Sequence, residues 1–171
     1  MTVVSFFVPG EPAPQGSKRH VGHGVMIEAN KRTAPWRATV AEHAMHAATR
    51  LGPPLAGPIE LTVNFTFRRH KAHYGTGRNA SELKPSAPLW KTSKPDLDKL
   101  VRAVADGIVD GGLIRDDSQI VLLIAEKHYG QPVGVRISLR EVPHETAFIS
   151  TDPAPAEAIE LGRQLAAKYD W

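Results

Sequence analysis

The segment at 59–68, IELTVNFTFR, is the feature that most limits the folds open to this chain. Its odd-numbered residues are apolar and its even-numbered residues are polar or charged. A period of two places these two sets of side chains on opposite faces of a β-strand. The segment therefore predicts a strand with one buried face, formed by Ile59, Leu61, Val63, Phe65 and Phe67.

The segment at 96–112 has the period of an α-helix instead. Pro95 disfavours helical backbone at Lys94, and Asp96 is of a residue type that commonly caps a helix. Gly111 and Gly112 end the pattern. The apolar positions that predict a buried stripe are Leu97, Leu100, Val101, Val104, Ala105 and Ile108. The positions that recur every four residues on a polar face are Asp98, Arg102, Asp106 and Asp110.

The rest of the chain carries weaker patterns. Residues 3–8 predict a first strand, residues 16–33 a loop or irregular hairpin, and residues 35–50 a helix. The apolar run at 118–130 predicts a buried strand, and residues 133–142 predict its partner in a hairpin. After a domain at 1–142, residues 143–171 predict a proline-containing linker and a C-terminal helix.

Length and composition are typical of a single globular domain. A chain of 171 residues is long enough to bury a core, and 42% of its residues are hydrophobic. It has no cysteine, which excludes disulfides and thiolate metal sites. No apolar run approaches the length of a membrane span, and the first residues lack the pattern of a signal peptide. We therefore expect a cytoplasmic protein that does not bind membranes.

Charge is unevenly distributed along the chain, whose net charge is +3. Residues 17–37 hold five Lys or Arg and one Glu. Residues 68–94 hold seven Lys or Arg and one Glu, and the residues that follow them, 95–117, hold six Asp. Basic arms attract a polyanion such as DNA, and clustered carboxylates repel it unless a cation lies between. The basic residues predicted to contact DNA, with an ordinary solvated surface as the alternative, are Lys18, Arg19, Lys31, Arg32, Arg68, Arg69, Lys71, Lys91, Lys94 and Lys99.

The aspartates beside the predicted helix indicate a metal site. Side chains two apart in a helix diverge by about 200°, but an extended Asp96 at the cap lets its carboxylate converge with that of Asp98. Asp116 or Asp117, just before the next strand, would supply a third ligand. Mg²⁺ takes one or two carboxylates plus water and substrate phosphate, and it promotes phosphodiester hydrolysis. The alternatives are helix capping for the first pair and a turn for the second.

Several histidines are weaker candidates. His43 and His46 lie three apart on the first predicted helix beside Glu42, a spacing compatible with zinc but more typical of solvated or partly buried histidines when no further ligand is clustered. His20 and His23 lie in a glycine-rich segment, where they would contact phosphate or simply belong to a flexible loop.

Residues 69–93 show no usable periodicity. A loop of this length in a compact domain is typically functional or disordered. It contains two isolated aromatic residues, Tyr74 and Trp90. They would either stack on unpaired bases or pack the loop onto the body of the domain.

The stretch KPDLDKLVRAVADGIVDGGLIRDDSQIVLLIAEKHYG at 94–130 resembles the RusA family of Holliday junction resolvases. The similarity lies in K-P-D-L-D-K-L, a short helix, D-D-S-Q, and a hydrophobic strand that ends in K-x-Y; VPGEPAPQGSKR at 8–19 resembles the family's opening strand and basic loop. The resemblance covers residues 1–142. It implies an α+β fold with a small mixed β-sheet and helices packed on it, a homodimer, and paired nicking of four-way DNA junctions with Mg²⁺ or Mn²⁺.

Carried across, the resemblance assigns the metal-binding carboxylates to Asp96, Asp98 and Asp117, with Asp116 the less favoured neighbour. The family's lysine one helical turn after the second aspartate is replaced here by Arg102. Arginine keeps the positive charge but does not donate a proton usefully, so we expect Arg102 to stabilise transition-state charge rather than act as an acid.

Two other functions remain open from the sequence. One is DNA binding without catalysis. The other is a D-x-D phosphatase or sugar-nucleotide enzyme, although a phosphatase usually has its nucleophilic aspartate after a buried strand, and a basic loop precedes Asp96 here.

Overall fold

The computed structural model describes residues 2–16, 18–20, 26–28 and 30–143. Its centre is a four-stranded mixed sheet with the order β1-β6-β4-β5. The strands are β1 (Val3–Pro9), β4 (Ile59–Phe67), β5 (Ile120–Tyr129) and β6 (Gly134–Glu141). β6 pairs antiparallel with both β1 and β4, and β5 pairs parallel with β4. The predicted α+β fold with a small mixed sheet is confirmed.

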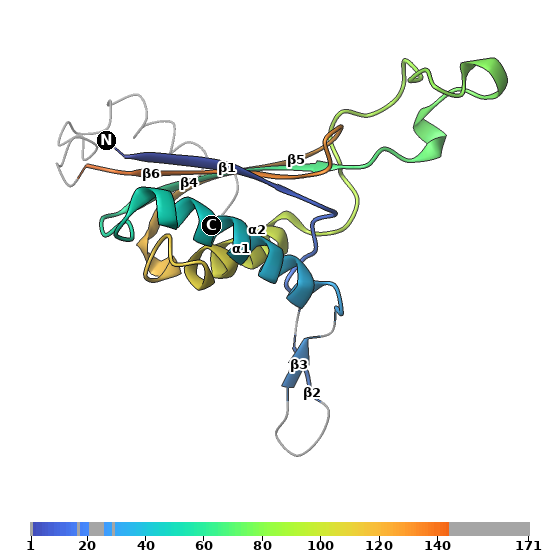
Figure 1. Cartoon of the computed structure of the whole chain (residues 1–171). Coiled ribbons are helices and arrows are strands. Elements are labelled where there is room, and N and C mark those ends of the chain that lie inside the picture. Colours follow the sequence, from blue (N-terminus) through green and yellow to red (C-terminus); the bar gives the residue numbers. More distant parts are fainter. Residues whose placement is uncertain (1, 17, 21–25, 29, 144–171) are drawn as a thin grey trace, which may run out of the picture.

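Two helices, α1 (Thr33–Leu51) and α2 (Leu97–Asp110), lie on one face of this sheet (Figure 1). They approach closely, because a side chain at Gly107 would meet Val40 at 2.7 Å and one at Gly111 would meet Ala44 at 2.5 Å. Arg37 of α1 also donates to Asp106 at 3.2 Å and to Asp110 at 2.8 Å. The predicted half-buried strand is confirmed, since every odd-numbered residue of β4 is buried beneath these helices.

The predicted hairpin between residues 118–130 and 133–142 is wrong. β5 and β6 follow one another in sequence, but β4 lies between them. The connection passes over the end of β4, where Gly130 N donates to Phe67 O at 2.9 Å. β6 takes the central place between β1 and β4, and its alternating Val135, Ile137 and Leu139 are fully buried.

The prediction that residues 118–130 form a buried strand is also wrong. The strand exists, but β5 is at the edge of the sheet, where β4 is its only neighbouring strand among the described residues and the segment at 89–91 pairs with its other side only near His128. Its apolar run is open to solvent, with exposed fractions of 62%, 47%, 48% and 51% at Val121, Leu122, Leu123 and Ile124. Among the described apolar residues of this strand, Ile120, Ala125 and Tyr129 pack against the core instead.

Two basic segments extend from the body (Figure 1). The first is the predicted irregular hairpin, in which β2 (Lys18–His20) pairs antiparallel with β3 (Met26–Glu28). The second is the segment at 68–95, called the arm below, which contains the short 3₁₀ helices η1 (Lys71–His73) and η2 (Gly77–Asn79). The arm is held by its own bonds, such as Lys84 N to His73 O at 3.0 Å.

The predicted linker and C-terminal helix at 143–171 lie, apart from Pro143, outside the described residues. Within the described part of the chain, no helix is both long enough and apolar enough to cross a bilayer.

Candidate active site

The first carboxylate of the predicted site lies at the N-terminus of α2. Asp96 is the N-cap residue, as predicted, with extended backbone angles of −69° and 141°. Its side chain does not cap the helix but accepts a hydrogen bond from Lys99 Nζ at 2.6 Å. This bond and the charge of Lys99 hold the pKa of Asp96 below its ordinary value, and the same bond raises the pKa of Lys99. Asp96 is therefore ionised at neutral pH.

The second carboxylate, Asp98, lies in the first turn of α2 and is exposed. Arg102 lies one turn further along and is exposed as well. Among the described residues Arg102 makes no ion pair, so an intrahelical pair with Asp98 or Asp106 does not occupy it, and Asp106 binds Arg37 instead. Both side chains are free to turn toward a ligand at this end of the helix.

A basic pocket of about 480 Å³ opens beside Asp96. Positive charge dominates its wall, where four cationic side chains face two carboxylates. The residues that line it are Glu11, Pro12, Pro14, Gly16, Asn30, Arg32, Phe67, Lys91, Lys94, Pro95, Asp96 and Lys99. The N-terminal loop, the arm and α2 thus meet at this pocket, which has the charge to accept a phosphate beside a carboxylate.

The end of β5 contacts the stretch of chain that lines the pocket just before Asp96. No role was predicted from the sequence for this end of the strand. Lys127 Nζ donates to Ser93 O at 3.0 Å and to Pro95 O at 2.6 Å. Burial, and then the charge of Lys91, lower the pKa of Lys127. Tyr129 lies two residues later and is 6% exposed. The sequence feature that marks both residues is the K-x-Y ending of the strand, which is part of the resemblance to the family.

The third carboxylate lies at the other end of β5. The 3₁₀ helix η3 (Asp117–Gln119) is capped by Asp116, whose side chain accepts from Ser118 N at 2.9 Å. These bonds from Ser118 lower the pKa of Asp116 and occupy its carboxylate, as expected of a turn residue. Asp117 is exposed and has no side-chain partner in the described part of the chain.

One copy of the chain does not bring the three predicted ligands together. Lys127, beside Pro95, follows Ile120 by seven strand residues, which corresponds to about 23 Å. Asp117 precedes Ile120, so it lies at the opposite end of α2 and β5 from Asp96 and Asp98. The described residues accordingly contain no group of three or more His, Cys, Asp or Glu side chains placed to hold a metal ion.

Four of the ten residues predicted to contact DNA line this pocket, namely Arg32, Lys91, Lys94 and Lys99. Arg32 lies at its rim and donates to Glu11 O at 3.2 Å, and Lys94 is exposed. Lys91 is only 7% exposed, with its ammonium 5.1 Å from the Phe67 ring centroid, so it reaches the pocket from within the protein. Arg68 and Lys71 are exposed at the base of the arm, as is Lys31 before α1, whereas Arg69 is partly buried and donates to Pro88 O. Lys18 and Arg19 lie on β2.

The aromatic residues of the arm differ in exposure. Tyr74 pairs with Leu83 inside the arm. Trp90 is 54% exposed, although its backbone forms a bridge with His128 of β5. Stacking of either ring on a base stays a prediction.

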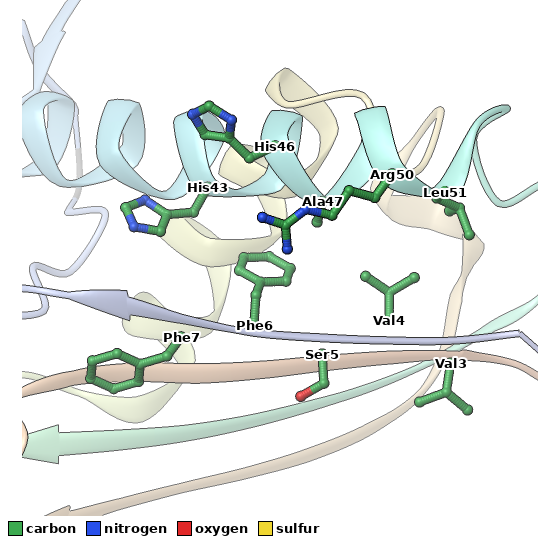
Figure 2. Close-up of a pocket in the computed structure, with 10 residues that line it drawn as sticks. All are labelled: Val3, Val4, Ser5, Phe6, Phe7, His43, His46, Ala47, Arg50 and Leu51. Atoms are coloured by element: carbon green, nitrogen blue, oxygen red, sulfur yellow. The ribbon is translucent and has the colours of Figure 1, made fainter.

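The paired histidines of α1 lie in a separate groove. His43 and His46 line it together with Arg50, and Figure 2 shows Val4 and Phe6 of β1 pointing toward the helix, with the guanidinium above Phe6. His43 Nδ1 is 3.0 Å from Thr39 O. This groove shares no lining residue with the pocket at Asp96. His20 lies on β2, and His23 lies outside the described residues.

Comparison with known proteins agrees with this architecture. The family model for endodeoxyribonuclease RusA matches residues 9–140, which run from the end of β1 into β6. The uncharacterized protein YqaN of Bacillus subtilis (strain 168) is 27% identical over 145 residues, covering 83% of this chain and 99% of YqaN. The crossover junction endodeoxyribonuclease rusA of Lactococcus phage r1t is 42% identical over 85 residues, covering 50% of this chain and 56% of the phage protein.

The matched segment contains β4, β5 and all of β6 except its last residue, both helices, the arm and the basic pocket at Asp96, but of β1 only Pro9. The likeness to the family therefore extends over most of the fold and over the candidate site. This chain belongs to the RusA family of endodeoxyribonucleases.

Proposed function

We propose that this endonuclease resolves four-way DNA junctions by paired nicking, that it requires Mg²⁺ or Mn²⁺, and that it acts as a symmetric homodimer. One observation carries the proposal: an ionised carboxylate, Asp96, lies in the wall of a pocket whose other charges are mostly cationic, at a helix start that also carries Asp98. The junction substrate is supported by the name of the phage relative. A cytoplasmic location, in a bacterium or in the host of a phage, is part of the same proposal.

The carboxylates suit a hard divalent cation. Mg²⁺ in proteins is commonly held by one or two carboxylates together with waters and a substrate phosphate. Asp96 and Asp98 would hold the metal, and Asp96 would exchange its contact with Lys99 for this ligation. A bound metal would supply Lewis-acid charge and activate water for attack on a phosphodiester.

The exposed run of β5 supports the homodimer. A long, flat, apolar edge strand is a template for pairing with another chain, and soluble proteins rarely leave one open. Here Val121, Leu122, Leu123 and Ile124 are each about half exposed or more, and the edge beside them is unpaired among the described residues. Two copies related by a two-fold axis would pair these edges antiparallel.

Antiparallel pairing also accounts for the distant third carboxylate. It would place the start of β5 in one copy beside the end of β5 in the other. Asp117 of the second copy would then lie near Lys127 and Pro95 of the first, and therefore near Asp96. Each of the two sites in such a dimer would combine Asp96 and Asp98 of one chain with Asp117 of the other.

The remaining side chains would bind and polarise DNA. Lys94 and Arg32 at the pocket would hold phosphates beside the scissile one. The exposed Lys and Arg side chains of the arm would bind the DNA backbone on either side. Arg102, four residues after Asp98 on the same face, would stabilise negative charge that grows on the phosphate during in-line attack by water. The expected products carry a 5′-phosphate and a 3′-hydroxyl.

A synthetic mobile four-way junction and a linear duplex of matched sequence test the proposal. We expect the junction to be cut in Mg²⁺ in preference to the duplex, at paired positions on opposing strands, with no cleavage of either DNA in EDTA. Equal rates on both DNAs would leave a general endonuclease and contradict junction resolution. Binding that persists in EDTA with no cleavage in Mg²⁺ or Mn²⁺ would indicate a binding protein instead.

A further inference from the structure

We infer that Lys127, at the end of β5, is a positioning residue that fixes the backbone leading into α2 and thereby orients the Asp96 carboxylate. The inference rests on the proposed metal site at Asp96 and adds to it the part of the fold that holds that carboxylate in place. Its basis is the set of contacts between two segments far apart in sequence.

Lys127 uses its ammonium group on the backbone of the arm. Nζ donates to the carbonyl oxygens of Ser93 and Pro95, at 3.0 and 2.6 Å. Hydrogen bonds with an ionised donor are roughly twice as strong as neutral ones. Two of the three N–H groups of the ammonium are therefore committed to carbonyls three residues and one residue before Asp96, which leaves one N–H for solvent or DNA.

Tyr129 and Lys91 reinforce the same attachment. The Tyr129 hydroxyl is 3.4 Å from Ser93 Oγ, which also accepts from Lys91 Nζ at 2.9 Å. The Lys91 ammonium is 5.4 Å from the centroid of the Tyr129 ring. A buried ammonium needs such partners, because without them its desolvation would be uncompensated.

Backbone bonds extend the contact into a short ladder. Lys91 N donates to Lys127 O at 3.2 Å, and Tyr129 N donates to Leu89 O at 2.9 Å. The end of the arm is thus paired with the end of β5 up to Lys91. The four residues from Thr92 to Pro95 carry the chain from this ladder to α2, and the described contacts of that stretch with β5 are the side-chain bonds of Lys127 and the Tyr129 hydroxyl.

The position of a metal-binding side chain depends on how firmly its backbone is held. Partners that orient a ligand without touching the metal commonly contribute 10- to 100-fold to metal affinity. Asp96 is the N-cap residue, so its extended backbone is not fixed by a preceding helical turn. Lys127 supplies the missing constraint from the sheet.

The test compares Lys127→Met, which keeps the apolar stem, with Lys127→Arg, which restores two or more donors. The matched control is Lys84→Met, because Lys84 also donates to a backbone carbonyl, that of Ala72 at 2.9 Å, but within the arm. Two quantities are measured: Mn²⁺ affinity of the DNA-free protein by titration calorimetry, and amide hydrogen exchange of the peptide covering 92–97 in metal-free protein.

We expect Lys127→Met to weaken Mn²⁺ binding by about 10-fold and to accelerate exchange at 92–97, while Lys127→Arg recovers most of both. Lys84→Met should leave both quantities at wild-type values. Unchanged affinity and exchange in Lys127→Met, with only weaker junction binding, would make Lys127 a phosphate contact and overturn the inference. Equal defects in Lys84→Met would overturn it as well.

Tyr129→Phe keeps the test decisive if Lys127→Met does not fold. This substitution removes only the hydroxyl beside Ser93. Faster amide exchange confined to 92–97 would support the attachment of this backbone to the end of β5, and unchanged exchange would overturn the inference. A wild-type protein that binds no Mn²⁺ would contradict the proposed function, and the exchange comparison would still decide whether Lys127 holds this backbone.

Discussion

Strands β4 and β5 are parallel neighbours rich in apolar residues, yet one is the centre of the core and the other is open to solvent. In β4 the apolar side chains from Ile59 to Phe67 are at most 2% exposed. In β5 the run from Val121 to Ile124 is between 47% and 62% exposed. The difference follows from position, since β4 has a strand on each side and β5 has one.

The comparison shows what an apolar pattern does and does not specify. Alternation in β4 identifies one buried face, and the helices of the same chain cover it. A continuous run in β5 identifies a strand that must be covered on more than one side, but the run does not say which chain covers it. In this protein the described residues leave it open, which is the reason for proposing a second copy.

The largest expected effect concerns the carboxylates at the two ends of β5. Asp96→Asn, Asp98→Asn and Asp117→Asn should each slow junction cleavage by about 1000-fold or more, because a metal supplies several kcal/mol of transition-state stabilisation. Junction binding should persist, since each change removes negative charge. Asp116→Asn should have a milder effect, because that carboxylate caps η3. Single-turnover cleavage and gel-shift assays measure the two quantities.

Mixing two inactive variants tests whether β5 edges join the sites. In a dimer of one Asp96→Asn chain and one Asp117→Asn chain, shared sites would leave one site with both changes and the other intact. Mixed subunits should therefore regain nicking of one strand. If each chain built its own site, the mixture would stay inactive, and the antiparallel pairing of β5 would be excluded.

One substitution in β4 and one in β5 test directly whether the two strands have different roles. Phe65→Ala in β4 should lower the free energy of unfolding by about 3–5 kcal/mol, because it leaves a cavity in the core. Leu123→Glu in β5 should leave a folded monomer that cleaves junctions about 100-fold or more slowly, because each site loses Asp117 of the other chain.

Light scattering and thermal unfolding separate these outcomes. Wild-type protein should scatter as a dimer, and Leu123→Glu should scatter near the chain mass of 18.6 kDa with an ordinary unfolding transition. A wild-type monomer at micromolar concentration would contradict the proposed dimer. A Leu123→Glu dimer that cuts normally would place the interface elsewhere.

Arg102 gives a smaller expected effect, confined to the chemical step. Arg102→Ala should slow single-turnover cleavage by about 100-fold, as is typical for loss of one preorganised charge-stabilising group. Arg102→Lys should retain much of the activity if charge alone is required, and little if a bidentate phosphate contact is required. Wild-type rates for Arg102→Ala at saturating protein would make this residue part of the solvated surface.

Local patterns predicted the elements of this fold and did not predict their order. The alternation of β4, the N-cap position of Asp96 and the end of α2 at Gly111 are in the structure as the sequence indicates, although the Asp96 side chain does not cap the helix. Strand order failed because a short connection favours a hairpin, whereas β6 pairs with β1 and β4 and not with β5. That outcome depends on contacts with β1 and β4, which no local pattern contains.

The site was predictable only as far as single residues and near neighbours go. Asp96 and Asp98 share a helix start, so spacing sufficed to pair them. Lys127 and Tyr129 support that helix start from 32 to 36 residues away in sequence, and the K-x-Y ending of the strand marks the two residues without indicating what they contact. Asp117 belongs to the far end of the strand, and a single chain gives no geometry that unites it with the others.

The smallest expected effect concerns an ion pair between α1 and α2, the two helices that cover β4. Arg37 of α1 donates to Asp110 of α2, and this bond holds the pKa of Asp110 below its ordinary value. A depressed carboxyl pKa in the folded state stabilises the fold above about pH 4, where the unfolded chain is also ionised. That contribution is lost as the pH falls through the folded pKa.

Since the two side chains are 38% and 41% exposed, solvent screens the pair. Asp110→Asn should therefore lower the free energy of unfolding at pH 7 by only about 0.5–1 kcal/mol, and the deficit should shrink toward pH 3 and in high salt. Urea unfolding at both pH values measures it, with Glu42→Gln as the control because Glu42 is an exposed acid of α1 without a partner in the described residues. A deficit that stays the same at pH 3 would mean that Asp110 stabilises the fold through packing between α1 and α2 and not through its charge.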